Sequence, residues 1–397
     1  MSDSPIYLDH AATTPLRREA LDAMLPLLTS DFGNPSSPHT VGRRARAALD
    51  EARERLARAL NAEPREIIFT AGGSEAINLA LKGVAWASKA RGNRIITSAV
   101  EHHAVLHALG HLEKFGFEIV HLPVDRYGRV DPDQLERELN DRTTLVSLLL
   151  ANNEVGTVQP ITDLVRRVRA HPGVAIHVDA VAAAPHIAID LRALDIDLLS
   201  LAAHKFEGPK GSGALYMRKG TVLLPQMQGG AQERYRRAGT ENVAGAVGMA
   251  VAYELAVAER SATSTRLAAQ RDRLRDALLG VPGVELTGHP RRRLPTHLSV
   301  IARDTTGEAM VLALDLEGVC ASVGSACTTG SLEPSHVLAA MGYPDDEARG
   351  SLRLSLGRTT SDDEIERAVR IVPSTIARLR AGSAVLSVDP LGEGVSA

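Results

Sequence analysis

The chain has 397 residues, of which 44% are hydrophobic and 23% are charged, and these proportions are typical of a globular protein rather than a disordered one. Its formal net charge of -3 gives no electrostatic reason to expect nucleic acid or an anionic membrane as a partner. Cys320 and Cys327 are too few for a disulfide framework, and residues 1–14 contain no apolar run of signal-peptide length. We therefore expect a cytoplasmic protein without a membrane span.

Strands and helices alternate along the first half of the chain. A short strand at the N-terminus and a loop rich in Asn, Pro and Ser precede a charged helix at residues 41–60. Apolar runs separated by helix-length segments then predict a parallel or mostly parallel sheet with helices on both faces. The predicted strands are 66–70, 94–99, 117–123, 144–151, 176–180 and 198–203.

The pattern changes in the last third of the chain. A long helix beginning near Gly239 is expected to bridge two lobes, and the short strands and helices after Pro282 suggest a smaller α+β lobe. The predicted domains are a large domain at 15–258, a small domain formed by 1–14 and 259–385, and a flexible tail at 386–397.

Polar or glycine residues follow the ends of five predicted strands. The carboxyl ends of the strands in a doubly wound sheet meet at one crevice, so these residues should form a single site. They are Gly73, Ser74, His102, Asn153, Asp179, His204 and Lys205.

Asp179 and Lys205 end two of these strands, so an acid and an amine should face the crevice. The pair could be a structural ion pair. It also suits pyridoxal phosphate chemistry, in which a lysine forms a Schiff base and an aspartate keeps the pyridine nitrogen protonated.

The other residues of the predicted crevice have plain alternatives. Ser74 and Thr240 each follow a glycine at a helix start, where they could bind a phosphate or only cap the helix. His102 could stack on a flat ring and move protons, or cap a helix. Asn153 could donate to the ring's phenolic oxygen, or cap a turn. We expect no metal at His103, His107 and His111, which share a helical face without a carboxylate.

The two cysteines differ in their surroundings. Cys320 lies in an apolar strand, where a thiol behaves as a small hydrophobe. Cys327 lies in a loop of Gly, Ser and Thr, where an exposed thiol can become a reactive thiolate. Downstream, Arg353 could clamp a substrate carboxylate with two hydrogen bonds, or form a surface ion pair.

The chain resembles the cysteine desulfurases, which are pyridoxal-phosphate enzymes of the class V aminotransferase fold. The resemblance covers nearly the whole length, and its most specific motif is the loop GSAC with LEPSHVL after it. It implies an α/β protein with the type I fold of pyridoxal-phosphate-dependent transferases, which has a mostly parallel, seven-stranded-type sheet in the large domain and a smaller α+β C-terminal domain. It also implies a homodimer with L-cysteine as substrate.

The resemblance implies a role for each site residue. Lys205 would hold the cofactor and move protons, with His102 stacked on the ring and Asp179 at its nitrogen. Cys327 would attack the substrate sulfur and become a persulfide, which passes sulfur to an iron-sulfur scaffold or a tRNA-thiolation factor. Thr240 would contact the phosphate from the neighbouring subunit, while Arg353, with Asn34 nearby, would hold the substrate carboxylate.

Three positions depart from the family's pattern. Ala182 stands where relatives have a glutamine that binds the ring's phenolic oxygen, and Ala202 where they have a serine that binds the phosphate. Glu207 replaces a small or apolar residue and is expected to add a carboxylate close to the cofactor. We expect weakened cofactor affinity with the chemistry retained.

Two other readings remain open. The first is another enzyme of the same fold, a selenocysteine lyase or a class V aminotransferase. The second is a scaffold protein with an impaired cofactor site, which only Ala182 and Ala202 favour.

Overall fold

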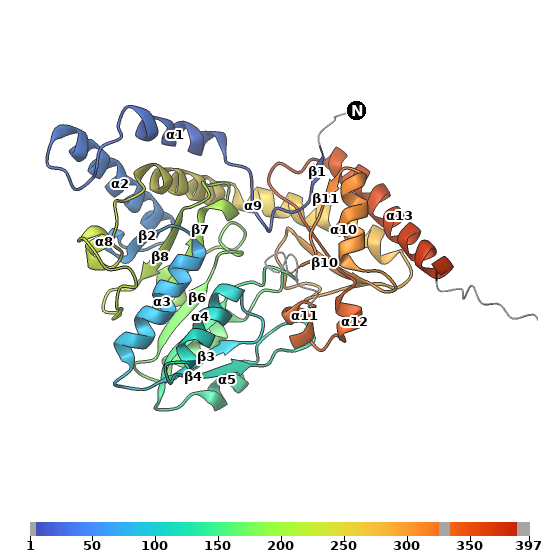
Figure 1. Ribbon diagram of the computed structural model, residues 1–397, viewed down its shortest axis with the longest axis horizontal. Coiled ribbons are helices and arrows are strands. Elements are labelled where there is room, and N and C mark those ends of the chain that lie inside the picture. The colour runs from blue at the N-terminus through green and yellow to red at the C-terminus, as the bar shows by residue number, and fades with distance from the viewer. Residues whose placement is uncertain (1–4, 325–333, 387–397) are drawn as a thin grey trace, which may run out of the picture.

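The computed structural model describes residues 5–324 and 334–386, which form two domains. Figure 1 shows the large domain, drawn mostly in blue and green, beside the small domain drawn in orange and red. Within the described ranges, no helix is long and apolar enough to cross a membrane. Cys327 and the predicted tail beyond Leu386 lie outside the described residues.

The large domain is organised around a seven-stranded sheet with the strand order β2-β8-β7-β6-β5-β3-β4. All its neighbouring pairs are parallel except the two that β8 makes, which are antiparallel. The prediction of a mostly parallel sheet is confirmed. The strands are β2 (Ile67–Thr70), β3 (Arg94–Ser98), β4 (Glu118–Leu122), β5 (Thr143–Leu149), β6 (Ala175–Asp179), β7 (Leu198–Ala202) and β8 (Gly213–Met217).

Helices cover both faces of this sheet because its central strands are apolar on both faces. Successive strand residues point to opposite faces, so Leu198 packs in one apolar cluster with helices α3 and α4 while Leu199 packs in another with α2, α6 and α9. The helices of the large domain are α1 (Arg18–Thr29), α2 (Thr40–Ala59), α3 (Gly73–Ser88), α4 (His103–Glu113), α5 (Pro132–Glu138), α6 (Ile161–Arg169), α7 (Leu191–Leu194) and α8 (Gln232–Tyr235).

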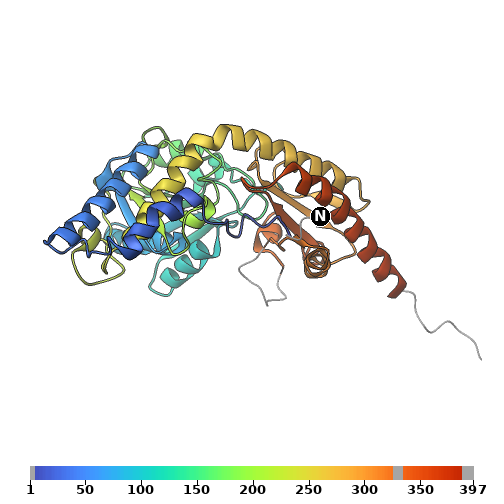
Figure 2. The same cartoon turned by 90° about the horizontal axis from the view of Figure 1, so that it is seen from above.

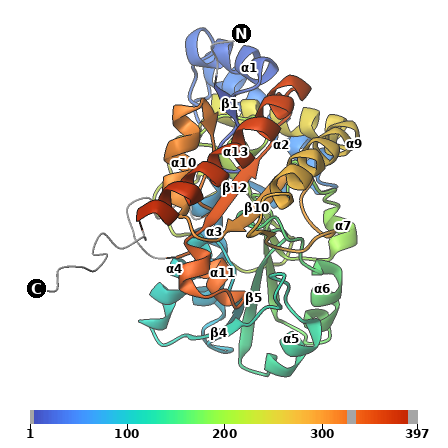
Figure 3. The same ribbon diagram turned by 90° about the vertical axis from the view of Figure 1, so that its right-hand side faces the viewer.

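The small domain contains a three-stranded antiparallel sheet and a two-stranded parallel one, in the orders β12-β10-β9 and β1-β11. The N-terminal strand β1 pairs with β11 in the two-stranded sheet. Figure 3 shows α13 crossing the β10 and β12 sheet. The strands are β1 (Ile6–Tyr7), β9 (Val284–Leu286), β10 (His297–Ala302), β11 (Val319–Cys320) and β12 (Ser351–Ser355); the helices are α10 (Gly307–Leu316), α11 (His336–Ala340), α12 (Asp345–Ala348) and α13 (Asp362–Leu386).

One long helix joins the two domains, as the sequence predicted. Helix α9 (Val243–Leu279) packs its first half on the large domain and its second half on the small domain, and Figure 2 shows it running across both. A separate apolar cluster lies between the two domains, where Leu149 and Val155 of the large domain pack with Ile301 and Leu338 of the small domain. The domains are therefore held together at the edge of the sheet where the predicted crevice lies.

Candidate active site

The predicted rim residues line one cavity of about 410 Å³ at the carboxyl ends of the parallel strands. Each follows or ends a strand, so the register of the sheet brings together residues that are far apart in the chain. The lining includes every residue predicted from the strand ends, together with the two alanines that depart from the family's pattern. These are Gly73, Ser74, His102, Asn153, Asp179, Ala182, Ala202, His204 and Lys205.

Asp179 ends β6 as a buried carboxylate, with 6% of the residue exposed. Its Oδ1 accepts a hydrogen bond of 2.9 Å from the backbone N–H of Val181, and it forms no ion pair with any described residue. Burial raises its pKa to about 6, although the Val181 hydrogen bond and the charge of Lys205 oppose the rise. A buried carboxylate without a cation of its own is suited to bind a cationic ligand atom.

Lys205 lies in the short helical turn that follows β7. Its Nζ donates to the backbone carbonyls of Ala11 and Ala12, at 2.5 and 2.9 Å. These carbonyls belong to the segment that leaves β1, and Thr14 on the same segment donates its hydroxyl to the carbonyl of His204 at 2.8 Å. The lysine is thus held between the large domain and the N-terminal segment.

His102 is the N-cap of α4, so the capping role and the position at the site occur together. Its Nδ1 accepts from the backbone N–H of Ala104 at 3.0 Å, which places the proton of the neutral ring on Nε2. Burial, with a contribution from the charge of Lys205, lowers the pKa of His102 to about 4. The ring is therefore neutral at physiological pH.

The N-terminus of α3 approaches the cavity closely. A Cβ on Gly73 would lie 2.8 Å from Val181 Cγ2 and 3.3 Å from the Ala202 side chain, so only glycine fits there. Gly72, with φ of +154°, turns the chain into the helix. The first amides of α3 thus reach the cavity wall, where they can bind an anionic group.

The remaining predicted residues lie elsewhere. Arg353 is buried, and its guanidinium donates to Asp9 Oδ1 at 2.9 Å and to the carbonyl oxygens of Asn153 and Gly324 at 3.0 and 3.1 Å. Arg353 therefore does form an ion pair, with Asp9, but its guanidinium is buried and not at the surface. Thr240 lines a different cavity, of about 140 Å³, and the exposed Asn34 is absent from the described residues that line the larger one.

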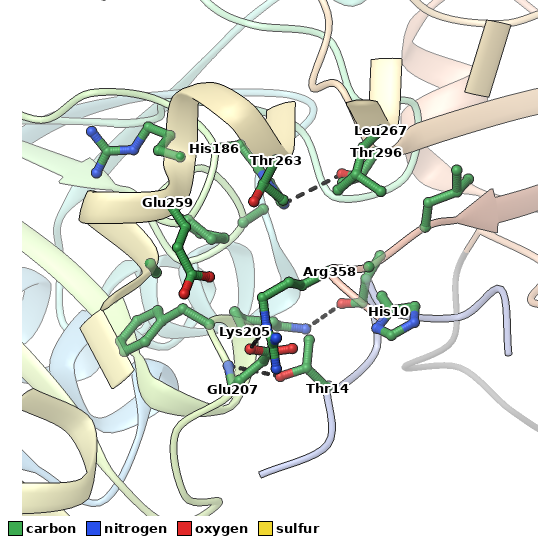
Figure 4. Close-up of a pocket in the computed structure, with 18 of the residues that line it drawn as sticks. His10, Thr14, His186, Lys205, Glu207, Glu259, Thr263, Leu267, Thr296 and Arg358 are labelled. Atoms are coloured by element: carbon green, nitrogen blue, oxygen red, sulfur yellow. Dashed lines mark hydrogen bonds and ion pairs between the residues drawn. The ribbon is translucent and has the colours of Figure 1, made fainter. Parts of the chain in front are cut away.

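Glu207 does not add its carboxylate to the wall of the larger cavity that the described residues form. It points instead into a second cavity of about 70 Å³ on another side of Lys205, where Arg17 and Arg358 both donate to its Oε2, at 3.0 and 2.6 Å (Figure 4). The expectation of a carboxylate at the cofactor is corrected, since two guanidinium groups hold it away. Ala182 and Lys205 line both cavities.

The histidines at positions 103, 107 and 111 lie on one face of α4, and their rings have different neighbours. His103 contacts His107, with ring centroids 5.0 Å apart, and also His336 of α11, at 4.6 Å, while His111 packs on Phe115. No group of three or more metal-ligating side chains with suitable geometry occurs in residues 5–324 and 334–386.

Sequence reasoning missed Glu101, which is fully buried beneath the site. Its Oε1 accepts from Ser98 Oγ at 2.6 Å and from the backbone N–H of Leu149 at 3.0 Å. Burial raises its pKa to about 8, with a smaller contribution from the neighbouring Asp179, so the group is protonated at neutral pH. The only signal in the sequence was its position directly after a strand end.

The match to known proteins extends over almost the whole chain. A model of the aminotransferase class-V family matches residues 6–368. The chain belongs to that family. It is 49% identical to the cysteine desulfurase IscS of Methanosarcina thermophila over 375 residues, which cover 94% of this chain and 93% of that protein. It is also 49% identical to the IscS of Dictyoglomus turgidum, over 94% of this chain and 95% of the relative.

Solved structures of family members have the same fold. A NifS-like protein superposes with a TM-score of 0.89 at 36% identity, covering 94% of this chain and all of the other. The structure of SspA in complex with cysteine gives a TM-score of 0.79 at 34% identity, over 89% of this chain and 99% of that one. The predicted fold class and the relationship to cysteine desulfurases are therefore confirmed.

Proposed function

We propose that the protein is a pyridoxal-phosphate-dependent cysteine desulfurase that converts L-cysteine to L-alanine and collects the sulfur as a persulfide on Cys327. One observation carries this proposal: Lys205 and Asp179, at the ends of neighbouring parallel strands, line one cavity in which the aspartate has no cationic partner among the described residues. The similarity to cysteine desulfurases at 49% identity supports it.

The residues present fit pyridoxal phosphate. The buried carboxylate of Asp179 suits a protonated pyridine nitrogen, and the first amides of α3 beyond Gly73 suit a phosphate. His102 supplies a flat ring at the same cavity, and Lys205 an amine that can bond an aldehyde. When bound, the cofactor supplies an electron sink for bonds broken at the substrate's α-carbon.

The chain's own residues divide the remaining tasks. Lys205 Nζ is the base and acid that moves protons at the substrate, because its amine is the one described at the cavity. His102 stays neutral, so it can accept a proton without first losing one. Asp179 would hold the ring by its nitrogen, and Arg353, whose guanidinium already donates to Asp9, Asn153 and Gly324 beside the cavity, would orient the substrate carboxylate.

The reaction balances without an outside oxidant. The thiolate of Cys327 attacks the sulfur of the substrate, whose bond to the β-carbon breaks, and that carbon takes up the proton of the substrate thiol. The products are alanine and a persulfide anion on Cys327. An acceptor protein of iron-sulfur cluster assembly or tRNA thiolation then takes the sulfur, and we propose that this transfer occurs in the cytoplasm.

We also propose a homodimer that completes each site. Thr240 lies in another cavity of its own chain, so its predicted phosphate contact requires a second copy. Exposed apolar side chains of the large domain offer a surface for that copy, and helices α1 and α8, which carry several of them, lie at the same end of the large domain in Figure 1. They include Leu21, Leu25, Leu28, Phe32, Val222, Leu224, Met227 and Tyr235.

Replacing each cysteine in turn tests the function. Wild-type protein with L-cysteine should release alanine and, with a reductant, an equal amount of sulfide, and Cys320→Ala should do the same. Cys327→Ala should release neither. Alanine release by Cys327→Ala would instead indicate a lyase that needs no thiol, and pyruvate-dependent turnover without sulfide would indicate an aminotransferase. Protein that bound no added cofactor would indicate a scaffold.

A further inference from the structure

The turn that follows β5 is rigidly built and lies at the rim of the larger cavity. The side-chain oxygen of Asn152 accepts from the backbone N–H groups of Glu154 and Val155, at 2.8 and 2.9 Å. Its amide nitrogen donates to the carbonyl of Val100 at 3.0 Å, which ties this turn to the neighbouring strand end. Asn153 and Glu154 are thereby presented side by side in the cavity wall.

Glu154 contacts both ends of the segment in which Cys327 lies. On one side, Ser335 Oγ donates to Glu154 Oε2 at 2.5 Å. On the other, Gly324 packs so closely on this carboxylate that a Cβ added to it would lie 3.2 Å from Oε2. The Glu154 side chain therefore lies close to Gly324, which precedes positions 325–333, and is hydrogen-bonded to Ser335, which follows them directly after Pro334.

Hydrogen bonds from the small domain reinforce each contact. Arg353 Nη1 donates to the carbonyl of Gly324 at 3.1 Å and to that of Asn153 at 3.0 Å. His336 Nε2 donates to the carbonyl of Glu101 at 2.9 Å, and its ring lies against that of His103, with centroids 4.6 Å apart. Arg353 thus links Gly324 to the backbone of Asn153, and His336 is bonded to the backbone next to His102. Figures 1 and 3 show α11 beside α4.

The Ser335 contact with Glu154 should be a strong one. Glu154 is 5% exposed and Ser335 is 4% exposed, and a hydroxyl-to-carboxylate distance of 2.5 Å is typical of charge-assisted hydrogen bonds. Removing the donor leaves a buried carboxylate short of a partner, which costs more than the loss of an exposed bond. Ser335 Oγ also accepts from the N–H of Leu338 at 3.3 Å, so the same hydroxyl caps α11.

We propose that Glu154 and Ser335 are positioning residues that fix the two ends of the Cys327 segment at the rim of the cofactor cavity and so set how often its thiol reaches the substrate. This proposal rests on the proposed function in that Cys327 is taken as the sulfur acceptor. Fixing both ends of a short segment raises the effective concentration of a group within it, and releasing one end lowers that concentration.

Replacement of Ser335 by alanine tests the proposal in the holoenzyme. We expect kcat for alanine formation to fall about tenfold, with KM for L-cysteine and cofactor affinity within about twofold of the wild type, because the lost bond orients the thiol only. In a Cys320→Ala background, the rate at which iodoacetamide alkylates Cys327 should change severalfold. Ser335→Thr, which keeps the hydroxyl, should restore both quantities.

A matched control separates anchoring from helix capping. Ser361 caps α13 as Ser335 caps α11, through a hydrogen bond of 3.2 Å from the N–H of Glu364, and it has no contact with Glu154. Ser361→Ala should leave kcat and alkylation unchanged. Glu154→Gln keeps an acceptor oxygen without the charge, so it should lower kcat less than Ser335→Ala does. This variant also tests the proposal if Ser335→Ala fails to fold.

The outcomes are distinguishable. Equal kcat and equal alkylation rates in Ser335→Ala and Ser361→Ala would overturn the proposal, as would equal values in Glu154→Gln and the wild type. If the wild type released no alanine, the proposed function would fail, yet the alkylation rates would still decide whether Glu154 and Ser335 position the segment.

Discussion

Two buried carboxylates close to Lys205 have opposite surroundings. Glu207, on the side of the small cavity, is bound by Arg17 and Arg358, so its charge is balanced within the chain. Asp179, on the side of the larger cavity, has no ion-pair partner among the described residues, and its burial raises its pKa to about 6. A balanced charge serves the fold, whereas an unbalanced one is stable only when something else supplies the counter-charge. The comparison supports the proposal that a ligand binds on the Asp179 side of the lysine.

Replacing Glu207 by alanine should have the largest effect on stability. Arg17 would lose its buried partner and keep only the half-exposed Glu259, which should lower the free energy of unfolding by about 3 kcal/mol. Glu259→Ala removes the other partner of Arg17, a half-exposed one, and should cost at most about 1 kcal/mol. Urea unfolding of both variants measures the difference; equal losses would show that Glu207 is not the structural carboxylate of the pair.

Glu101 should make stability depend on pH. The pKa of Glu101 in the folded protein is raised to about 8, so its ionisation disfavours the folded state. The stability that the protonated group contributes is complete below the pKa of the unfolded chain and is lost as pH rises toward 8. Relative to Glu101→Gln, the wild type should lose up to about 1.4 kcal/mol per pH unit between pH 5 and 8. Unfolding free energies of the two proteins that run parallel across this range would contradict the assignment.

Asp179 should make cofactor binding depend on pH in the opposite direction. Its carboxylate must be ionised to pair with a protonated ring nitrogen, so protonation below its pKa of about 6 competes with binding. The affinity of the wild type for pyridoxal phosphate, divided by that of Asp179→Asn, should fall about tenfold per pH unit below 6. Taking the ratio cancels the ionisations of the cofactor itself. A ratio that stays constant from pH 5 to 7 would show that this carboxylate does not contact the ring nitrogen.

The two alanines of the cavity should have the smallest effects. Ala182→Gln and Ala202→Ser each introduce a side chain that can donate one hydrogen bond at the cavity wall, which should tighten pyridoxal phosphate binding by about 0.5 to 1.5 kcal/mol. Equilibrium titration measures each variant separately. Unchanged affinity in both would show that the departures from the family's pattern carry no cost.

The strand-end residues could be predicted from the sequence because a repeated βα pattern gathers strand ends in one place. Asp179, Lys205, His102 and Ser74 needed only that rule and their chemistry. The destination of Glu207 could not be predicted, since it depends on Arg17 and Arg358, which are 190 and 151 residues away in the chain. Partners that are distant in the sequence therefore determine where the Glu207 side chain points.

The small domain's share of the site was harder to predict for the same reason. Ser335 reaches Glu154, and His336 lies against His103, a contact that helical spacing within α4 does not indicate. The α1 helix and the antiparallel strand β8 were also not assigned from periodicity, although both proved part of the large domain. Packing between domains follows from tertiary contacts that a local pattern does not contain.

Identifying the lysine that bonds pyridoxal phosphate tests the central claim most directly. The holoenzyme is reduced with borohydride, which makes the attachment permanent, then digested and mapped by mass spectrometry. The account predicts one pyridoxyl label per chain, on Lys205, and none on the exposed Lys210 of the same segment. A label on Lys210, or on no lysine of a protein saturated with cofactor, would contradict it.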